Sequence, residues 1–150
     1  MKIVLQRVKS AGVSINGGAF STIGEGLVLL VGISARDDEK TACFMAEKAV
    51  NLRIFDDEDG NLNRSVLDCN GECLIISNFT LYGNCRKGRR PSFAEAAPRS
   101  LSQPLYEFFV KALRDTGIQT VLDGEFGADM QVSILNDGPV TVILDSDEIM

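Results

Sequence analysis

Residues 76–93, which read ISNFTLYGNCRKGRRPSF, contain the sharpest change of character in the chain. The residues that lead into them, Cys73 to Ile76, are apolar and partly β-branched, as in a buried strand. The next residues are polar, and a strand that ends in this way points short hydrogen-bonding groups out of a rigid sheet. The candidate catalytic residues are therefore Ser77, Asn78, Phe79 and Thr80. A strand end capped by local side-chain hydrogen bonds is the plainer alternative.

A cluster of positive charge follows the polar strand end. It holds four of the chain's 15 basic residues, although the whole chain has a net charge of −6. The four residues are Arg86, Lys87, Arg89 and Arg90. A glycine-punctuated loop of this charge indicates anion binding, because lysine and arginine pair with phosphate and carboxylate groups. An ordinary solvated loop is the alternative.

Three motifs give the chain a resemblance to a known family. They lie at Ser77 to Leu81, Lys87 to Phe93, and Asn136 to Thr141. They resemble the Ser-Gln-Phe-Thr-Leu, Lys-Gly-x-Arg-Pro-Ser-Phe and Asn-x-Gly-Pro-x-Thr motifs of the D-aminoacyl-tRNA deacylases. The likeness covers nearly the whole chain, including residues 52–55 and 126–130. One position departs from the family, since Asn78 replaces a glutamine that is one methylene longer.

The resemblance implies a homodimeric, metal-independent esterase that needs no cofactor. It would hydrolyse D-aminoacyl-tRNA, and mischarged glycyl-tRNA, to free tRNA and amino acid as a step of translation quality control. In the family the Gly-Pro bond is cis and enters the active site of the other subunit, where its carbonyls would collide with an L side chain. The implied substrate-binding residues are Gly138, Pro139, Met130, Asn136 and Thr141. The basic cluster would then contact phosphates at the tRNA acceptor end.

The chain contains no histidine, which removes every Ser-His and Cys-His catalytic arrangement. Nothing beside Thr80 in the sequence activates its hydroxyl as a nucleophile. The resemblance implies instead that the 2′-hydroxyl of the terminal ribose takes part in attacking the neighbouring ester. We assign the developing oxyanion to the backbone N–H of Phe79, with that of Thr80 as a second donor.

Composition favours one ordinary globular domain over residues 1–150, with 45% hydrophobic and 24% charged residues. No segment approaches the roughly 20 apolar residues that span a bilayer, and the N-terminus does not read as a signal peptide. We expect a cytoplasmic protein with no membrane or DNA partner. The four cysteines are irregularly spaced and are interpreted as reduced thiols. A zinc site made by Cys69, Cys73 and Cys85 is the alternative.

Apolar periodicity predicts an α+β domain with a mostly antiparallel, curved or barrel-like sheet and two amphipathic helices. Strands are expected over residues 2–8, 10–15, 19–23, 27–33, 73–76, 118–122, 130–135 and 140–144. The first helix is capped by Asp37 or Asp38 and buries a stripe that ends at Val50. The second opens at Ser102 and Pro104 and stops at Gly117.

Pro139 interrupts what otherwise reads as one long strand, because proline cannot donate to a sheet ladder. The plain interpretation is a strand break. The sharper one is that Gly138 allows unusual backbone angles and Pro139 has no N–H, so the pair can present unopposed carbonyls. Carbonyls turned away, or a trans bond, would suit an L-specific or general aminoacyl ester hydrolase. The alternative from another class is a non-catalytic module of the same fold that binds an RNA end or a small ligand.

Overall fold

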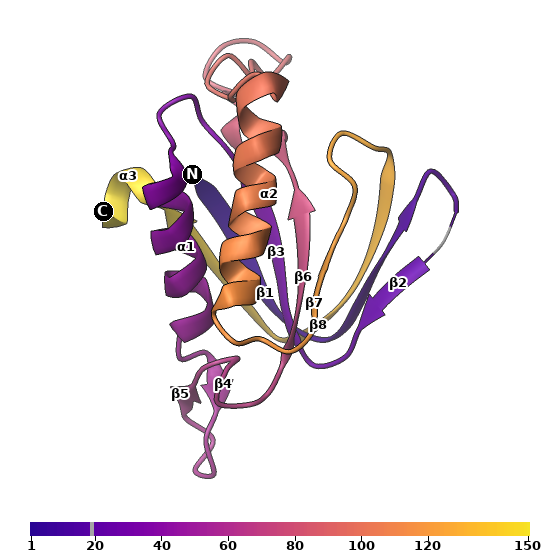
Figure 1. The fold of residues 1–150 in the computed structure, drawn as a ribbon, viewed down its shortest axis with the longest axis vertical. Coiled ribbons are helices and arrows are strands. Elements are labelled where there is room, and N and C mark those ends of the chain that lie inside the picture. Colours follow the sequence, from indigo (N-terminus) through magenta and orange to yellow (C-terminus); the bar gives the residue numbers. More distant parts are fainter. Residues whose placement is uncertain (19) are drawn as a thin grey trace.

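A six-stranded mixed sheet forms the centre of the computed structural model, which describes residues 1–18 and 20–150 (Figure 1). Its strands are β1 (Lys2–Ile15), β2 (Phe20–Ile23), β3 (Gly26–Gly32), β6 (Glu72–Ser77), β7 (Val121–Asp123) and β8 (Met130–Asp145). β1 pairs antiparallel with β2, β3 and β8, whereas β3, β6 and β7 run parallel to one another. A small antiparallel hairpin, β4 (Phe55–Asp56) and β5 (Leu62–Arg64), lies apart from the sheet. The α+β prediction is confirmed.

The first strand curves the sheet. β1 pairs with β3 through residues 2–8 and with β2 through residues 11–14, while β8 follows it along both halves. β2 also approaches β6 and β7, so the sheet curls into a nearly closed, barrel-like form. The prediction of separate strands over 2–8 and 10–15 is wrong, because β1 stays continuous through its exposed residues Lys9 and Ser10. The predicted strand over 19–23 is described from Phe20, and its first residue lies outside the described part.

Two helices cover one face of the sheet, α1 (Glu39–Asn51) and α2 (Arg99–Asp115) (Figure 1). Alternate strand residues face them, so that Leu29 and Ile75 pack in the helix-covered core. Their neighbours Val28 and Leu74 point the other way into a second core inside the curl. β3 is buried along nearly its whole length, which confirms the prediction of a central strand covered on both faces.

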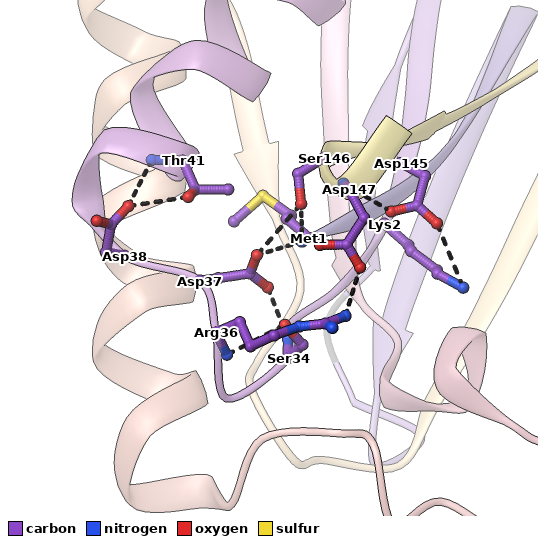
Figure 2. Close-up of polar contacts among 10 residues, drawn as sticks. All are labelled: Met1, Lys2, Ser34, Arg36, Asp37, Asp38, Thr41, Asp145, Ser146 and Asp147. Carbon is purple, nitrogen blue, oxygen red and sulfur yellow. Dashed lines mark hydrogen bonds and ion pairs between the residues drawn. The ribbon is translucent and has the colours of Figure 1, made fainter. Parts of the chain in front are cut away.

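Two adjacent aspartates before α1 have different tasks, as Figure 2 shows. Asp38 is the N-cap, since its Oδ1 accepts the N–H and the hydroxyl of Thr41, each at 2.8 Å. Asp37 is buried instead and pairs with the α-amine of Met1, while its other oxygen accepts the Ser34 N–H at 2.7 Å. Ser146, at the start of the short helix α3 (Ser146–Ile149), also accepts from the Met1 amine.

The second helix begins earlier than its prolines suggest. α2 starts at Arg99 with Pro98 as its N-cap, so the predicted opening at Ser102 and Pro104 is wrong. Ser102 is buried within the first turns and donates from its hydroxyl to the Pro98 carbonyl at 3.0 Å. Pro104 is accommodated inside the helix. The predicted stop is confirmed, because Gly117 follows the C-cap with a φ of 100°.

The C-terminal strand differs most from its prediction. Residues 130–145 form one strand, so the predicted break at Pro139 is wrong. Between the pairs Gln6↔Thr141 and Val8↔Asn136, the residues 137–140 bulge out opposite Arg7 alone. The Gly138–Pro139 bond in this bulge is cis, and Gly138 has a φ of 121°. Residues in the bulge have no pairing partner on β1, so the missing N–H of Pro139 interrupts no ladder hydrogen bond and the strand continues beyond it.

Other boundaries shift by a few residues. β7 covers Val121–Asp123 rather than 118–122, and the hairpin β4–β5 and helix α3 were not anticipated. No helix within the described residues is both long and apolar enough to cross a membrane.

Candidate active site

A cavity of about 240 Å³ opens where the parallel strands β3 and β6 end. Segments that are far apart in the sequence line it. They are Val31, Ile33, Ser77, Asn78, Phe79, Ala97, Ser102, Phe126, Gly127, Ala128 and Met130. The carboxyl end of parallel strands is a common place for ligands in sheets that carry helices.

The polar end of β6 turns directly into a 3₁₀ helix, η1 (Phe79–Tyr82), at the cavity wall. The Asn78 N–H donates to the Val31 carbonyl at 2.8 Å, which ties this turn to β3. Because a helix has no internal acceptors for its first N–H groups, those of Phe79 and Thr80 have no acceptor among the described hydrogen bonds. These two adjacent main-chain donors are available to a ligand.

The side chains of Asn78 and Thr80 are engaged with each other. The Thr80 hydroxyl donates to Asn78 Oδ1, and Asn78 makes no side-chain cap to η1. No lysine, carboxylate or imidazole contacts the Thr80 hydroxyl among the described hydrogen bonds, so nothing there withdraws its proton. This arrangement can polarise a carbonyl through the main chain but does not activate a side-chain nucleophile.

Helix α2 contributes Ser102 to the cavity wall and is anchored to β6. Tyr106 is buried and donates from its hydroxyl to the Ile75 carbonyl at 3.0 Å, which anchors the helix to β6. Burial raises the pKa of Tyr106, so this hydroxyl keeps its proton and remains a donor. The Tyr106 ring also packs on Phe126 at 5.7 Å between centroids, and the Arg99 guanidinium lies 6.0 Å from the Phe126 ring. Phe126 is thereby held against the helix.

The basic loop lies beside the same cavity. Its ends are joined by two hydrogen bonds between Asn84 and Ser92, of 2.7 and 3.0 Å. Phe93 then packs on Phe79 in an edge-to-face pair with centroids 5.1 Å apart. The four basic side chains, Arg86, Lys87, Arg89 and Arg90, are all exposed. Within the described chain none of the four takes part in an ion pair.

The Gly138–Pro139 bulge does not line the cavity of its own chain. It lies opposite Arg7, which pairs with Leu27 near the start of β3, whereas Ser77 pairs with Val31 near the end of β3. The predicted residues Asn136 and Thr141 flank the bulge and are exposed, and Thr141 accepts from Gln6 at 3.3 Å. One chain therefore brings together Ser77, Asn78, Phe79 and Met130 and leaves the Gly-Pro group elsewhere.

Arg7 is the functional candidate that sequence reasoning missed. It is only 6% exposed, donates from Nε to the Asp137 carbonyl at 3.2 Å, and donates from Nη1 to the Ile54 carbonyl at 2.9 Å. It also pairs with the carboxylates of Asp137 and Asp56 at 3.3 and 3.4 Å. Arg7 therefore fixes the residue just before Gly138. The available signal was an arginine inside an apolar strand pattern, where long charged residues are rarely buried without partners.

Other lining residues gave no chemical signal in the sequence. Ala97 is positioned by its N–H, which donates to the Ile33 carbonyl at 2.9 Å, and Ser102 is positioned by its bond to Pro98. No local sequence pattern marks Ala97 and Ser102 as residues that line a cavity.

The cysteines do not support the zinc alternative. Among the described residues no three histidine, cysteine or carboxylate side chains gather as a metal site. Cys73 is fully buried in β6, and burial raises its pKa to about 12, whereas Cys85 is exposed in the basic loop.

The fold and cavity define an α+β protein with a main-chain donor site at the carboxyl end of parallel strands. A family model described as D-Tyr-tRNA(Tyr) deacylase matches residues 4–145. A D-aminoacyl-tRNA deacylase of Thermosipho africanus is 52% identical over 99% of both chains, and one of Bacillus thuringiensis is 54% identical over 97% of this chain and 99% of the relative. A solved structure titled c-Myc DNA Unwinding Element Binding Protein has a TM-score of 0.91 and 44% identity, covering 97% of this chain and 98% of its own.

The chain therefore belongs to the D-aminoacyl-tRNA deacylase family, whose members are hydrolases of the aminoacyl-tRNA ester bond.

Proposed function

We propose that the protein hydrolyses D-aminoacyl-tRNA, and mischarged glycyl-tRNA, to free tRNA and amino acid. The observation that carries the proposal is the pair of N–H groups of Phe79, which lines the cavity, and of its neighbour Thr80, since neither has an acceptor within the described residues. Two fixed donors at one point suit the oxyanion that forms when an ester carbonyl is attacked. Such a donor typically lowers the barrier by about 3–4 kcal/mol.

The nucleophile in this proposal is not a protein side chain but water, assisted by the tRNA itself. Water adds to the ester carbonyl carbon with the participation of the neighbouring ribose 2′-hydroxyl, and the bond to the 3′-oxygen then breaks as that oxygen takes up a proton. The main chain at Phe79 stabilises the negative charge in between. The Thr80 hydroxyl supports the turn through Asn78 rather than attacking the ester.

Chirality would be read by a second copy of the chain. The site of one chain lacks the Gly138–Pro139 group, while β8 pairs only with β1 among the described strands and carries two exposed apolar residues, Leu135 and Ile143, 61% and 71% exposed. Long apolar edge strands are templates for pairing between chains. In a homodimer the bulge of one subunit would enter the cavity of the other, where its carbonyls would collide with an L side chain. A D side chain points away from them, and glycine has none.

The basic loop would hold the acceptor end of tRNA. Its charged groups are exposed and form no ion pair in the part of the chain that the structure describes, and they follow the strand that ends at the cavity. Phosphate contacts of this kind position a nucleic acid with little sequence preference. Because aminoacyl-tRNA is the substrate of translation, the proposed activity would serve translation quality control in the cytoplasm.

The direct test is deacylation of D-tyrosyl-, L-tyrosyl- and glycyl-tRNA by purified, metal-stripped protein. Rapid loss of the D and glycyl esters with sparing of the L ester is expected. Pro139→Ala should change this discrimination, because it changes the backbone that carries the carbonyls. Cleavage of no ester above the spontaneous rate would refute the catalytic proposal.

Two variants separate the roles of neighbouring side chains. Thr80→Ala should retain much of the activity, because the proposed donor is main-chain. A folded, tRNA-binding Thr80→Ala protein with no activity would refute the substrate-assisted route. Asn78→Gln restores the longer amide of the family, and a large gain in rate would mean that Asn78 lowers the activity of this chain.

The second candidate is a nucleic-acid-binding module without chemistry. Its support is the exposed basic loop and the name of the solved relative that is 44% identical, c-Myc DNA Unwinding Element Binding Protein. The deacylation assay discriminates the two, because a binding module would protect or ignore the ester bond.

A further inference from the structure

The rim of the cavity carries an exposed aromatic pair that the proposed chemistry leaves unused. Phe79 and Phe93 are 58% and 38% exposed, and their rings meet edge to face with an interplanar angle of 73°. Their position is fixed from both sides. Phe79 belongs to η1, and the Phe93 carbonyl accepts the Ala96 N–H at 3.1 Å one residue before the cavity-lining Ala97.

The cavity is too small for more than the end of a nucleic acid. Its volume of about 240 Å³ lies below the roughly 300–1,000 Å³ of sites that enclose a drug-sized ligand. The nucleotide that precedes the esterified one must then lie outside, toward the rim. Phe93 stands between the cavity wall and the basic loop, which begins its return at Ser92.

We propose that the Phe93 ring, braced by Phe79, is a stacking platform for the base of the nucleotide that precedes the aminoacylated one. The inference rests on the proposed function and deepens it. Exposed aromatic rings beside a positively charged loop are the usual means of binding single-stranded nucleic acid, because every base offers a π-face. The loop cations would hold the phosphate and the ring would hold the base.

The test uses three minimal D-tyrosyl esters: of adenosine, of cytidylyl-adenosine (CpA), and of the same dinucleotide with an abasic first sugar. The last two share the added phosphate and differ only in the base. The base should raise kcat/KM by about 5- to 150-fold in the wild-type protein, the usual range for one stacked base. In Phe93→Leu, which keeps an apolar contact with Phe79, this ratio should fall below about twofold.

A matched control is Phe20→Leu, since Phe20 is another exposed phenylalanine, 57% exposed, on the distant strand β2. Its ratio should equal that of the wild type. Because each ratio compares two substrates of one variant, a general loss of rate or folding cancels. An undiminished ratio in Phe93→Leu, or no base effect in the wild type, would overturn the inference.

A second measurement does not depend on catalysis. The chain contains no tryptophan, so Phe93→Trp supplies a single fluorescent indole at the platform. Unesterified CpA should quench its emission, and the abasic dinucleotide should not. If no ester is hydrolysed, the proposed function fails while this quenching still decides the stacking. Equal quenching by both dinucleotides would place the base elsewhere.

Discussion

Two clusters of charge follow the ends of the neighbouring parallel strands β3 and β6. After β3, the Met1 amine and Asp37 lie buried together, with Ser34 and Ser146 completing their hydrogen bonds (Figure 2). After β6, the basic loop is exposed and its side chains have no ion-pair partner in the described chain.

The difference separates charges that serve the fold from charges available to a ligand. A buried charge must find its partner within the protein, since removal from water is costly. Exposed cations without partners add little to stability. In a chain of net charge −6, such a concentrated group is readable as a binding surface.

The largest effect should come from breaking the buried cluster. Asp37→Asn leaves the Met1 amine buried without its counter-charge, so the free energy of unfolding should fall by about 3–5 kcal/mol. Urea denaturation followed by circular dichroism measures it. The control is Asp147→Asn, which removes an exposed pair with Arg36 and should cost less than about 1 kcal/mol. Equal losses in both variants would show that burial does not set the difference.

The cysteines allow the same comparison between buried and exposed groups. Burial raises the pKa of Cys73 from 9.0 to about 12, so its thiolate should be about a thousandfold rarer than that of an unperturbed thiol. Iodoacetamide should therefore modify the exposed Cys43 and Cys85 in the folded protein and spare Cys73 until denaturant is added. Peptide mass spectrometry over time assigns each site. Early modification of Cys73 would mean that β6 opens locally.

Neutralising the basic loop should weaken tRNA binding without affecting folding. With four phosphate contacts to a single strand, log K should fall with log salt at a slope of about −3, or about 50-fold between 50 and 200 mM salt. Replacing Arg86, Lys87, Arg89 and Arg90 with glutamine should flatten this slope and leave the melting temperature unchanged. Lys40→Gln with Lys48→Gln, two exposed lysines on α1, is the matched control. A flat salt response in the wild type would remove the loop from the interface.

The smallest effect concerns the exposed helix cap beside the buried pair. Hydrogen bonds from Thr41 lower the pKa of Asp38 below its ordinary 3.8. A lowered pKa in the folded state means that ionised Asp38 stabilises the fold above pH 3.8, and this contribution disappears as the pH falls through the folded-state pKa. Asp38→Asn keeps a good cap. The wild type should therefore melt slightly higher than the variant near neutral pH and lose that advantage in acid, as thermal melts between pH 2 and 7 would measure.

Much of the fold follows from local patterns. The apolar run of β3, the stripe of α1 and the glycine that ends α2 were all readable, because each reflects burial or backbone geometry within a few residues. The start of α2 was misread because proline after the first turn is tolerated when packing supplies the stability. The continuity of β8 through Pro139 depends on a bulge opposite Arg7, which only the pairing of distant strands reveals.

The candidate site was readable in its parts but not in its assembly. The polar strand end, the basic loop and the Gly-Pro pair each carry a chemical signature. The burial of Arg7 and the contribution of Ala97 and Ser102 to the cavity depend on tertiary contacts, so no local pattern contains them. No local pattern shows that the polar turn lies near one end of β3 while the bulge of β8 lies, across β1, near the other end.

The two backbone hydrogen bonds between Asn84 and Ser92 close the basic loop and make it a suitable position for inserting other segments. Its two ends are joined by paired hydrogen bonds, so the strand and helix on either side do not depend on what lies between them. Doubling the length of a flexible loop adds only about 0.6 kcal/mol of closure cost. Segments of other lengths and charges can therefore be inserted there, so the surface beside the cavity becomes an engineering variable while the residues that line the cavity stay unchanged.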